Sequence, residues 1–294
     1  MSIFQLPVAV RALYTENDVY KPKLKKDWLR SGNNKKSPTK SGIKKPIQKT
    51  RPLKQKKSKF DVDEDTFKYS QRLQSLYFAI YEFIFAVGLF IILDSELFHT
   101  GNMFLETFQK RKMLGLPIPK NITFVFINGD EDSVIPETTN EFNIQFIKTD
   151  IYTYVKNLED KTKILLLWND SMSAYHTEYR NNRTKQRFSS TEQLFDLMCQ
   201  KQLFDDTFVM WNANFGRHNK NTYYSDESQF NIASRNFLSA GYRTTDLSWH
   251  LLDEKINPIE RNGCSTVMYK YNDNPSSYYL FHMFKVEKII IELD

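Results

Sequence analysis

The stretch "FIILDSELFHTGNMFLETFQ", from Phe90 to Gln109, decides how the rest of the chain is interpreted. It begins with a short apolar run, reaches an acid at Asp94, and continues beyond Gly101 with helical spacing. A short apolar run without alternation is typical of a strand buried on both faces, as in a parallel sheet. We therefore expect a buried first strand, a ligand-binding turn around Gly101, and a helix over 103–113.

The residues before this strand predict a helix. The acidic "DVDED" that begins at Asp61 is a typical helix start, and apolar residues then recur at helical spacing as far as Val87. Gly88 separates this helical pattern from the strand-like "LFIILD".

Beyond the first strand, apolar runs alternate with helical patterns. The expected strands are 122–128, 144–149, 163–168, 207–212 and 266–271, and the further expected helices are 151–158, 191–201 and 230–240. Strands and helices in alternation predict an α/β fold with a mostly parallel sheet flanked by helices.

The charged residues divide the chain into parts. Residues 21–60 contain 16 Lys or Arg and one acid, Asp27, so this segment carries +15. Because the whole chain carries +6, the other residues carry −9. The segment 21–60 also has few apolar residues, so we expect a disordered basic arm. It would lie between a possible docking segment (1–20) and a folded domain (61–294).

A basic arm of this kind favours binding to nucleic-acid phosphates, with an affinity that falls steeply as salt rises. We therefore expect RNA to bind through the arm, from Lys21 to Lys59. The alternatives are nuclear targeting, a solubilising tail, and an arm that folds back on the acidic domain.

The cysteine content favours a reducing compartment. Cys199 and Cys264 are too few for a disulfide framework, and the five histidines do not cluster with them at metal-ligand spacing. We therefore expect a cytoplasmic protein without a bound metal.

A membrane-anchored lumenal protein is the alternative location. Residues 77–93 are apolar except for Glu82, and they follow the basic segment, as in a membrane helix whose tail lies in the cytoplasm. Against this, the run is short, and a mid-membrane Glu82 would cost roughly 2–3 kcal/mol. Three glycosylation sequons would then face the lumen, at Asn121, Asn169 and Asn182.

Polar residues follow four of the expected strands, where open parallel sheets bind their ligands. An acid after the second strand can accept both ribose hydroxyls, and one after the third can reach an adenine amino group. The expected ligand-binding residues are Asp94, His99, Thr100, Gly101 and Asn102 after the first strand, Asp130 after the second, Asp150 and Ile151 after the third, and Asn169 with Asp170 after the fourth. This order suits a nucleoside ligand.

The set resembles the class I S-adenosylmethionine-dependent methyltransferases, and within them the poxvirus-type cap 2′-O-methyltransferase that doubles as a poly(A) polymerase regulatory subunit. Three stretches carry the resemblance, which spans roughly 70–285: "FHTGNMFLETF", "FVFINGDED" and "SYYLFHMF". It implies a Rossmann-like methyltransferase fold, S-adenosyl-L-methionine as the cofactor, and RNA as the substrate.

The resemblance also implies a Lys-Asp-Lys-Glu catalytic set, in which a lysine of lowered pKa activates the ribose hydroxyl. The first lysine corresponds to Lys68 or Arg72, and the aspartate to Asp170 or Asn169. The second lysine falls on Met210 or Trp211 and the glutamate near Thr266, so two of the four groups are absent.

We therefore expect a viral-type RNA-processing protein that is catalytically degenerate and acts as a regulatory or partner subunit in mRNA cap or poly(A) metabolism. Such a protein would work in the host cytoplasm or the virion and would bind a protein partner as well as RNA. The alternatives are an active RNA cap 2′-O-methyltransferase and the membrane-anchored lumenal protein.

Overall fold

The computed structural model describes residues 67–95, 97–130, 133–136, 140–171, 174–180, 187–214, 229–247, 259–261, 264–270 and 278–290. The expected segments 1–20 and 21–60 lie outside these residues.

Nine strands of the described part form one mixed sheet with the order β3-β2-β1-β4-β7-β11-β10-β9, and β8 also pairs with β11. Neighbouring strands from β3 to β7 run parallel. The bounds are β1 (Gly88–Leu93), β2 (Ile122–Ile127), β3 (Ile144–Ile147), β4 (Ile164–Asn169), β7 (Thr207–Asn214), β8 (Tyr242–Asp246), β9 (Ile259–Arg261), β10 (Cys264–Lys270) and β11 (Tyr278–Lys288). The predicted α/β fold with a mostly parallel sheet is confirmed.

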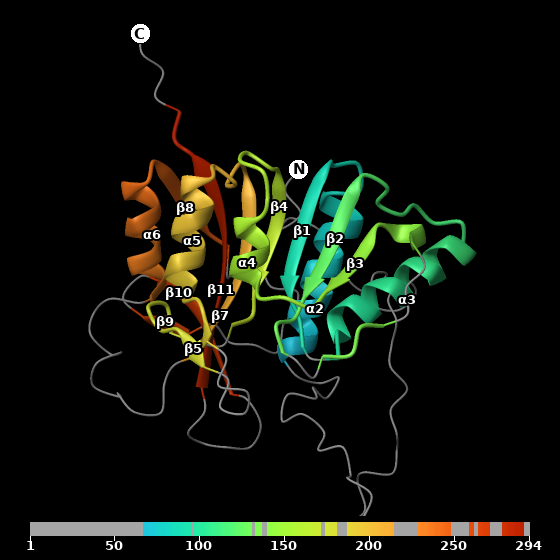
Figure 1. Ribbon diagram of the computed structural model, residues 1–294, viewed down its shortest axis with the longest axis horizontal. Coiled ribbons are helices and arrows are strands. Elements are labelled where there is room, and N and C mark those ends of the chain that lie inside the picture. Colours follow the sequence, from blue (N-terminus) through green and yellow to red (C-terminus); the bar gives the residue numbers. More distant parts are fainter. Residues whose placement is uncertain are drawn as a thin grey trace, which may run out of the picture.

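The strand order reverses between β1 and β4. The chain adds β2 and β3 on one side of β1, and then β4 and β7 on the other side (Figure 1). In doubly wound sheets a ligand binds at such a switch point, beyond the carboxyl ends of the strands. The arrowheads of β1 and β2 point to one common edge, which we call the carboxyl edge (Figure 1).

One long strand, β11, runs against the direction of its neighbours. It pairs antiparallel with β7 on one side, and on the other side with β10 along its first part and β8 along its second. Since β7 and β8 are both antiparallel to β11, they are parallel to each other. The sequence patterns predicted neither β8 nor β11.

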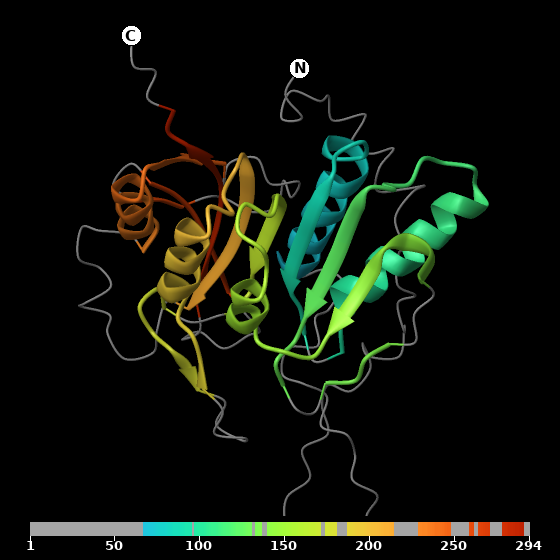
Figure 2. The ribbon, with the colours of Figure 1, turned by 45° about the horizontal axis from the view of Figure 1, so that its top comes forward.

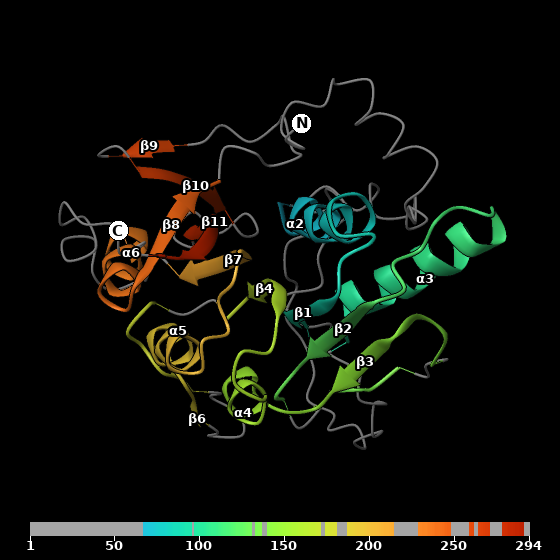
Figure 3. The same ribbon diagram turned by 90° about the horizontal axis from the view of Figure 1, so that it is seen from above.

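Helices cover both faces of the sheet, as the view from above shows (Figure 3). The helices α2 (Phe67–Tyr77) and α3 (His99–Met113) pack on one face, where they share a core with β1 and β2. The helices α4 (Ile151–Lys156), α5 (Thr191–Gln200) and α6 (Gln229–Ser239) lie on the other face, over a second core. Two helical turns, η4 (Phe78–Glu82) and η5 (Asn140–Phe142), complete the helical elements of the described residues.

Aromatic side chains build much of the core beneath α3. The rings of Phe104 and Phe108 pack edge-on against Phe124 of β2 at centroid distances of 5.4 and 5.2 Å. Phe124 in turn contacts Phe90 of β1 at 5.3 Å. These fully buried rings fix α3 on the sheet and therefore position its N-terminus at the carboxyl edge.

The helical segment before β1 ends earlier than predicted, at Glu82 and not at Val87. It begins at Phe67 in the described residues, and α2 changes at Tyr77 into the single π-helical turn η4, which ends at Glu82. A turn then leads to β1. Within the described residues, no helix has both the length and the apolar character needed to cross a bilayer.

Candidate functional site

The polar residues expected at the strand ends lie along the carboxyl edge. Asp94 follows β1, Asp130 lies just beyond β2, and Asp150 just beyond β3. Asn169 is the last residue of β4, and Asp170 follows it. These carboxylates and amides have different hydrogen-bond partners. The partners determine which reactions or ligands each side chain can support.

Asp94 is engaged by the backbone at the start of α3. One carboxylate oxygen accepts hydrogen bonds from the amides of Ser95 (2.8 Å) and Thr100 (3.2 Å), and the other from that of Gly101 (2.8 Å). The side chain is only 7% exposed. The acid therefore satisfies amides that an α-helix leaves unpaired at its N-terminus.

The predicted loop around Gly101 is in fact the first turn of α3. The helix begins at His99, after Phe98 in the left-handed region (φ 49°). A Cβ on Gly101 would lie 2.3 Å from the ring of Phe146 and 2.9 Å from that of Phe126. Glycine is needed here for the close packing of helix on strand, and the residue is buried.

The neighbours of Gly101 also make local contacts. The amide of His99 donates to the hydroxyl of Ser95 at 3.3 Å. The side-chain amide of Asn102 donates to the carbonyl of Leu97 at 3.1 Å. Both contacts stabilise the tight turn into α3.

Asn128, which the sequence analysis missed, joins the ends of β1 and β2. Its side-chain nitrogen donates to the carbonyl of Asp94 at 2.8 Å. Its side-chain oxygen accepts from the amide of Asp130 (2.8 Å) and from the hydroxyl of Ser133 (2.5 Å). This buried amide shapes the turn that presents Asp130, which is half-buried.

Asp150 caps a helix. Its carboxylate accepts from the amide of Thr153 at 2.9 Å, which makes it the N-cap of α4. Ile151, the first residue of α4, is half-buried against the core on this face.

Asn169 and Asp170 face different partners. The buried Asn169 donates from its side-chain nitrogen to the hydroxyl of Thr191 at the start of α5, at 3.0 Å. Asp170 instead accepts from the side-chain nitrogen of Asn212 on β7, at 2.9 Å. Both residues expected at the catalytic aspartate lie next to β7, since Asn169 pairs with Trp211 in the sheet, and Asp170 is the one whose side chain accepts from a β7 side chain.

Asn212 also forms a reciprocal pair of hydrogen bonds with Gln71 of α2. Each side-chain nitrogen donates to the other side-chain oxygen at 2.9 Å, and both side chains are fully buried. We call Gln71, Asn212 and Asp170 the amide–carboxylate cluster. It ties α2, β4 and β7 together at the carboxyl edge, across 141 residues of sequence.

Asn212 lies one or two residues beyond Met210 and Trp211, the residues expected at the second catalytic lysine, and its side chain is the one on β7 that donates to Asp170. Met210 and Trp211 are fully buried in the two cores, whereas Asn212 holds the position that contacts Asp170. Its partner across the sheet on β11 is Phe281, an apolar residue. Thr266 lies on β10, a strand that does not pair with β7.

The two candidates for the first lysine lie on α2. Lys68 is part of the helix, but its side chain lies outside the described atoms. Arg72 is half-buried, and its Nε is a buried atom without a hydrogen-bond partner. Gln71 is the α2 side chain with a described contact to Asn212.

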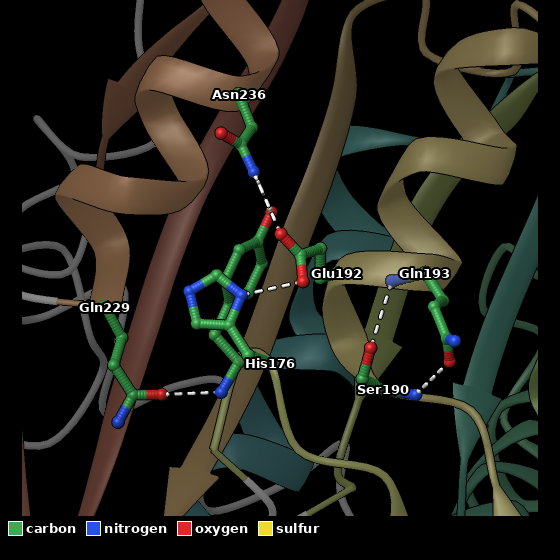
Figure 4. A network of polar contacts seen from close by, with 7 residues as sticks. His176, Ser190, Glu192, Gln193, Gln229 and Asn236 are labelled. Atoms are coloured by element: carbon green, nitrogen blue, oxygen red, sulfur yellow. Dashed lines mark hydrogen bonds and ion pairs between the residues drawn. The ribbon is translucent and has the colours of Figure 1, made fainter.

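A second polar network lies beside α5 and α6 (Figure 4). His176 pairs with Glu192 at 2.7 Å, and Asn236 reaches the same carboxylate at 3.5 Å. Ser190 and Gln193 form a capping box at the start of α5. A hairpin is formed by β5 (Tyr179–Arg180) and β6 (Arg187–Phe188). His176 precedes this hairpin and Glu192 follows it, so their contact joins the two ends of the hairpin.

Other chemistries find little support among the described residues. Burial raises the pKa of the Cys199 thiol to about 12, so the thiol stays protonated and is a poor nucleophile. The described part of the chain contains no group of three or more His, Cys, Asp or Glu side chains placed to hold a metal ion.

Sequence reasoning found the acids of the carboxyl edge but not their partners. Gln71, Asn128 and Asn212 were missed. Asn128 and Asn212 stand in the "ING" and "WNANFG" stretches at strand ends, where a polar residue within an apolar run was the available signal.

No protein-family model matches the sequence, and no curated protein matches it significantly.

Proposed function

We propose that this chain is an RNA-processing protein of methyltransferase fold that does not transfer methyl groups and acts as a regulatory or partner subunit in mRNA cap or poly(A) metabolism. The observation that carries this proposal is the amide–carboxylate cluster. Asp170 contacts the neutral amide of Asn212, and Asn212 contacts the neutral amide of Gln71.

The strand order supports the fold assignment. A doubly wound parallel core with its switch between β1 and β4 is common to many nucleotide-binding proteins. A reversed strand inserted next to the fifth parallel strand is the feature that class I methyltransferases add to it, and β11 lies in that place.

The chemistry of the cluster argues against methyl transfer. Activating a ribose hydroxyl requires a group that can take its proton, and a lysine of lowered pKa can do so. A carboxamide neither gains nor loses a proton near neutral pH, so Asn212 and Gln71 cannot replace the lysines. Phe281, beside Asn212, cannot replace the glutamate.

The residues at the end of β1 do not fit S-adenosyl-L-methionine well. Its methionine carboxylate would need the amides at the start of α3, but those of Thr100 and Gly101 already donate to Asp94. A second carboxylate would meet the charge of this buried acid.

The proposed RNA contact rests on the basic arm. The segment 21–60 carries a charge of +15, whereas the other residues of the chain together carry −9. RNA phosphates should therefore bind the arm rather than the acidic remainder of the chain.

We expect no methyl transfer from S-adenosyl-L-methionine to capped RNA, because neither carboxamide of the cluster can accept the proton of the ribose hydroxyl. The measurement is incorporation of a labelled methyl group by the full chain, with an active cap methyltransferase assayed in parallel. Incorporation that disappears in Asp170→Ala would refute the proposal and establish the active enzyme instead.

We expect RNA affinity to depend on the arm. Replacing the 16 Lys and Arg residues of 21–60 with Gln should weaken binding at least about a hundredfold at low salt and flatten its salt dependence, because fewer counterions are released. The measurement is fluorescence anisotropy with labelled RNA over a salt series. The matched control neutralises the exposed Lys156, Lys161 and Lys163. Equal affinity of the arm variant and the wild type would exclude the arm as the RNA contact.

A further inference from the structure

The hairpin β5–β6 contacts the carboxyl edge through one aromatic ring. A Cβ on Gly129, the second residue after β2, would lie 2.5 Å from Cε1 of Phe188. It would also lie 3.3 Å from the carbonyl oxygen of Thr149 and 3.4 Å from Cα of Asp150. The Phe188 ring therefore lies directly against the backbone where the ends of β2 and β3 meet.

Under the proposed function, a nucleoside would occupy this junction. Asp130, next to Gly129, would accept the ribose hydroxyls, and Asp150 would reach the adenine amino group. A flat base bound between them has to pass over Gly129. The Phe188 ring already covers that residue, and no base can be inserted beneath a ring in direct contact with the backbone.

The hairpin is anchored at its base. On one side, Tyr175 is 1% exposed, and its amide donates to the side chain of Gln229 at 2.9 Å. On the other side, Ser190 begins α5 with its capping box. The hairpin itself projects at the carboxyl edge, beyond these contacts (Figure 2). Phe188, two residues before Ser190, is half-buried.

We propose that Phe188 takes the place of a nucleobase at the ends of β2 and β3, so that a nucleoside binds there only after the hairpin β5–β6 moves off Gly129. The choice of a nucleoside as the ligand rests on the proposed function, whereas the contact does not. Only molecules in which the hairpin has moved off Gly129 would bind the nucleoside. The apparent affinity is therefore the intrinsic affinity multiplied by the fraction of such molecules. Removing the ring removes that penalty.

A double-mutant cycle tests the contact without any ligand. Gly129→Ala should lower the unfolding midpoint of the wild type, because the new methyl group meets the Phe188 ring. In a Phe188→Ala background the same change should cost far less, because the ring is gone. Thermal unfolding of the four proteins gives the coupling. Equal cost of Gly129→Ala in both backgrounds would overturn the inference.

A binding experiment tests the consequence. Adenosine and S-adenosylhomocysteine are titrated calorimetrically into the full chain, Phe188→Ala, and the control Phe85→Ala, whose side chain is 87% exposed. We expect Phe188→Ala to bind adenosine at least about tenfold more tightly than the other two proteins. Unchanged or weaker binding by Phe188→Ala, or binding by none of the proteins, overturns the inference.

The two proposals fail separately. Methyl transfer by the wild type would contradict the proposed function and would not depend on Phe188→Ala. Loss of the Phe188 effect would leave the results on the basic arm and on methyl transfer unchanged.

Discussion

The protein should lose stability steeply as the pH falls from about 6.5 toward 3, and His282 should account for much of the loss. Burial lowers the pKa of His282 to about 3, from an ordinary value of 6.5. Below pH 6.5 the unfolded chain binds a proton at this histidine and the folded protein does not. The unfolding equilibrium should therefore shift by about a factor of ten per pH unit across this window, and the full contribution is present above pH 6.5.

The surroundings of His282 explain why it stays neutral. The side chain is 1% exposed, and its ring lies 5.0 Å from the ring of Trp211 and stacks at 5.7 Å on that of Phe230. Among the residues that the structure describes, neither ring nitrogen has a hydrogen-bond partner. Aromatic neighbours without an accepting group cannot compensate for a buried positive charge.

The measurement is urea unfolding of the wild type and His282→Phe at pH values from 7 to 4. We expect His282→Phe to match or exceed the wild type at pH 7, because the ring nitrogens make no hydrogen bond that would be lost. Its midpoint should then fall less on acidification. His176→Phe is the matched control, since His176 is exposed and pairs with Glu192. Parallel pH profiles of the wild type and His282→Phe would rule out this role.

Asn212→Leu should destabilise the fold by about 3 kcal/mol, because it leaves the fully buried amide of Gln71 without its partner. Asp170 loses a hydrogen bond in the same variant. For a domain of this size, a loss of that magnitude corresponds to a melting temperature lower by about 6–12 °C. The measurement is thermal unfolding followed by circular dichroism.

The double variant Gln71→Leu/Asn212→Leu distinguishes the cost of leaving one buried amide without its partner from the cost of changing the side-chain packing. Replacing both amides with apolar side chains removes the unsatisfied group, so the double variant should be less destabilised than the sum of the single ones. Asn157→Leu, at an exposed position, is the control and should change stability by less than about 0.5 kcal/mol. A wild-type melting temperature for Asn212→Leu would contradict a structural role for the pair.

Periodicity made the elements of the parallel core predictable. The apolar runs that became β1, β2, β4 and β7 are largely buried on both faces, so each is a continuous hydrophobic stretch. The run that became β3 lies at the edge of the sheet and includes the exposed Gln145. The short hairpin β5–β6 and the strands β8 and β11 were not found. The sequence of β8 is "YRTTD", which is largely polar, and β11 pairs with β7 and β8, which are distant in sequence, as well as with the neighbouring β10.

In the candidate site, too, the positions of the acids were predictable from the sequence, whereas their contacts were not. Asp94, Asp130, Asp150 and Asp170 stand at the ends of strands, and strand ends are local features that residue spacing predicts. What each acid binds was not predictable. Asp94 and Asp150 are used by the helices that follow them, and the helical character of residues 99–102 was obscured by Gly101.

By itself, the sequence determined the alternation of strand and helix, the acids at the carboxyl edge, and the concentration of positive charge in residues 21–60. These are local properties, set by the period of the chain and by composition. Only the tertiary structure decided that Asp170 meets an amide, and that Phe188 covers Gly129. Such contacts join residues far apart in the chain, and they depend on how the sheet and its helices pack together.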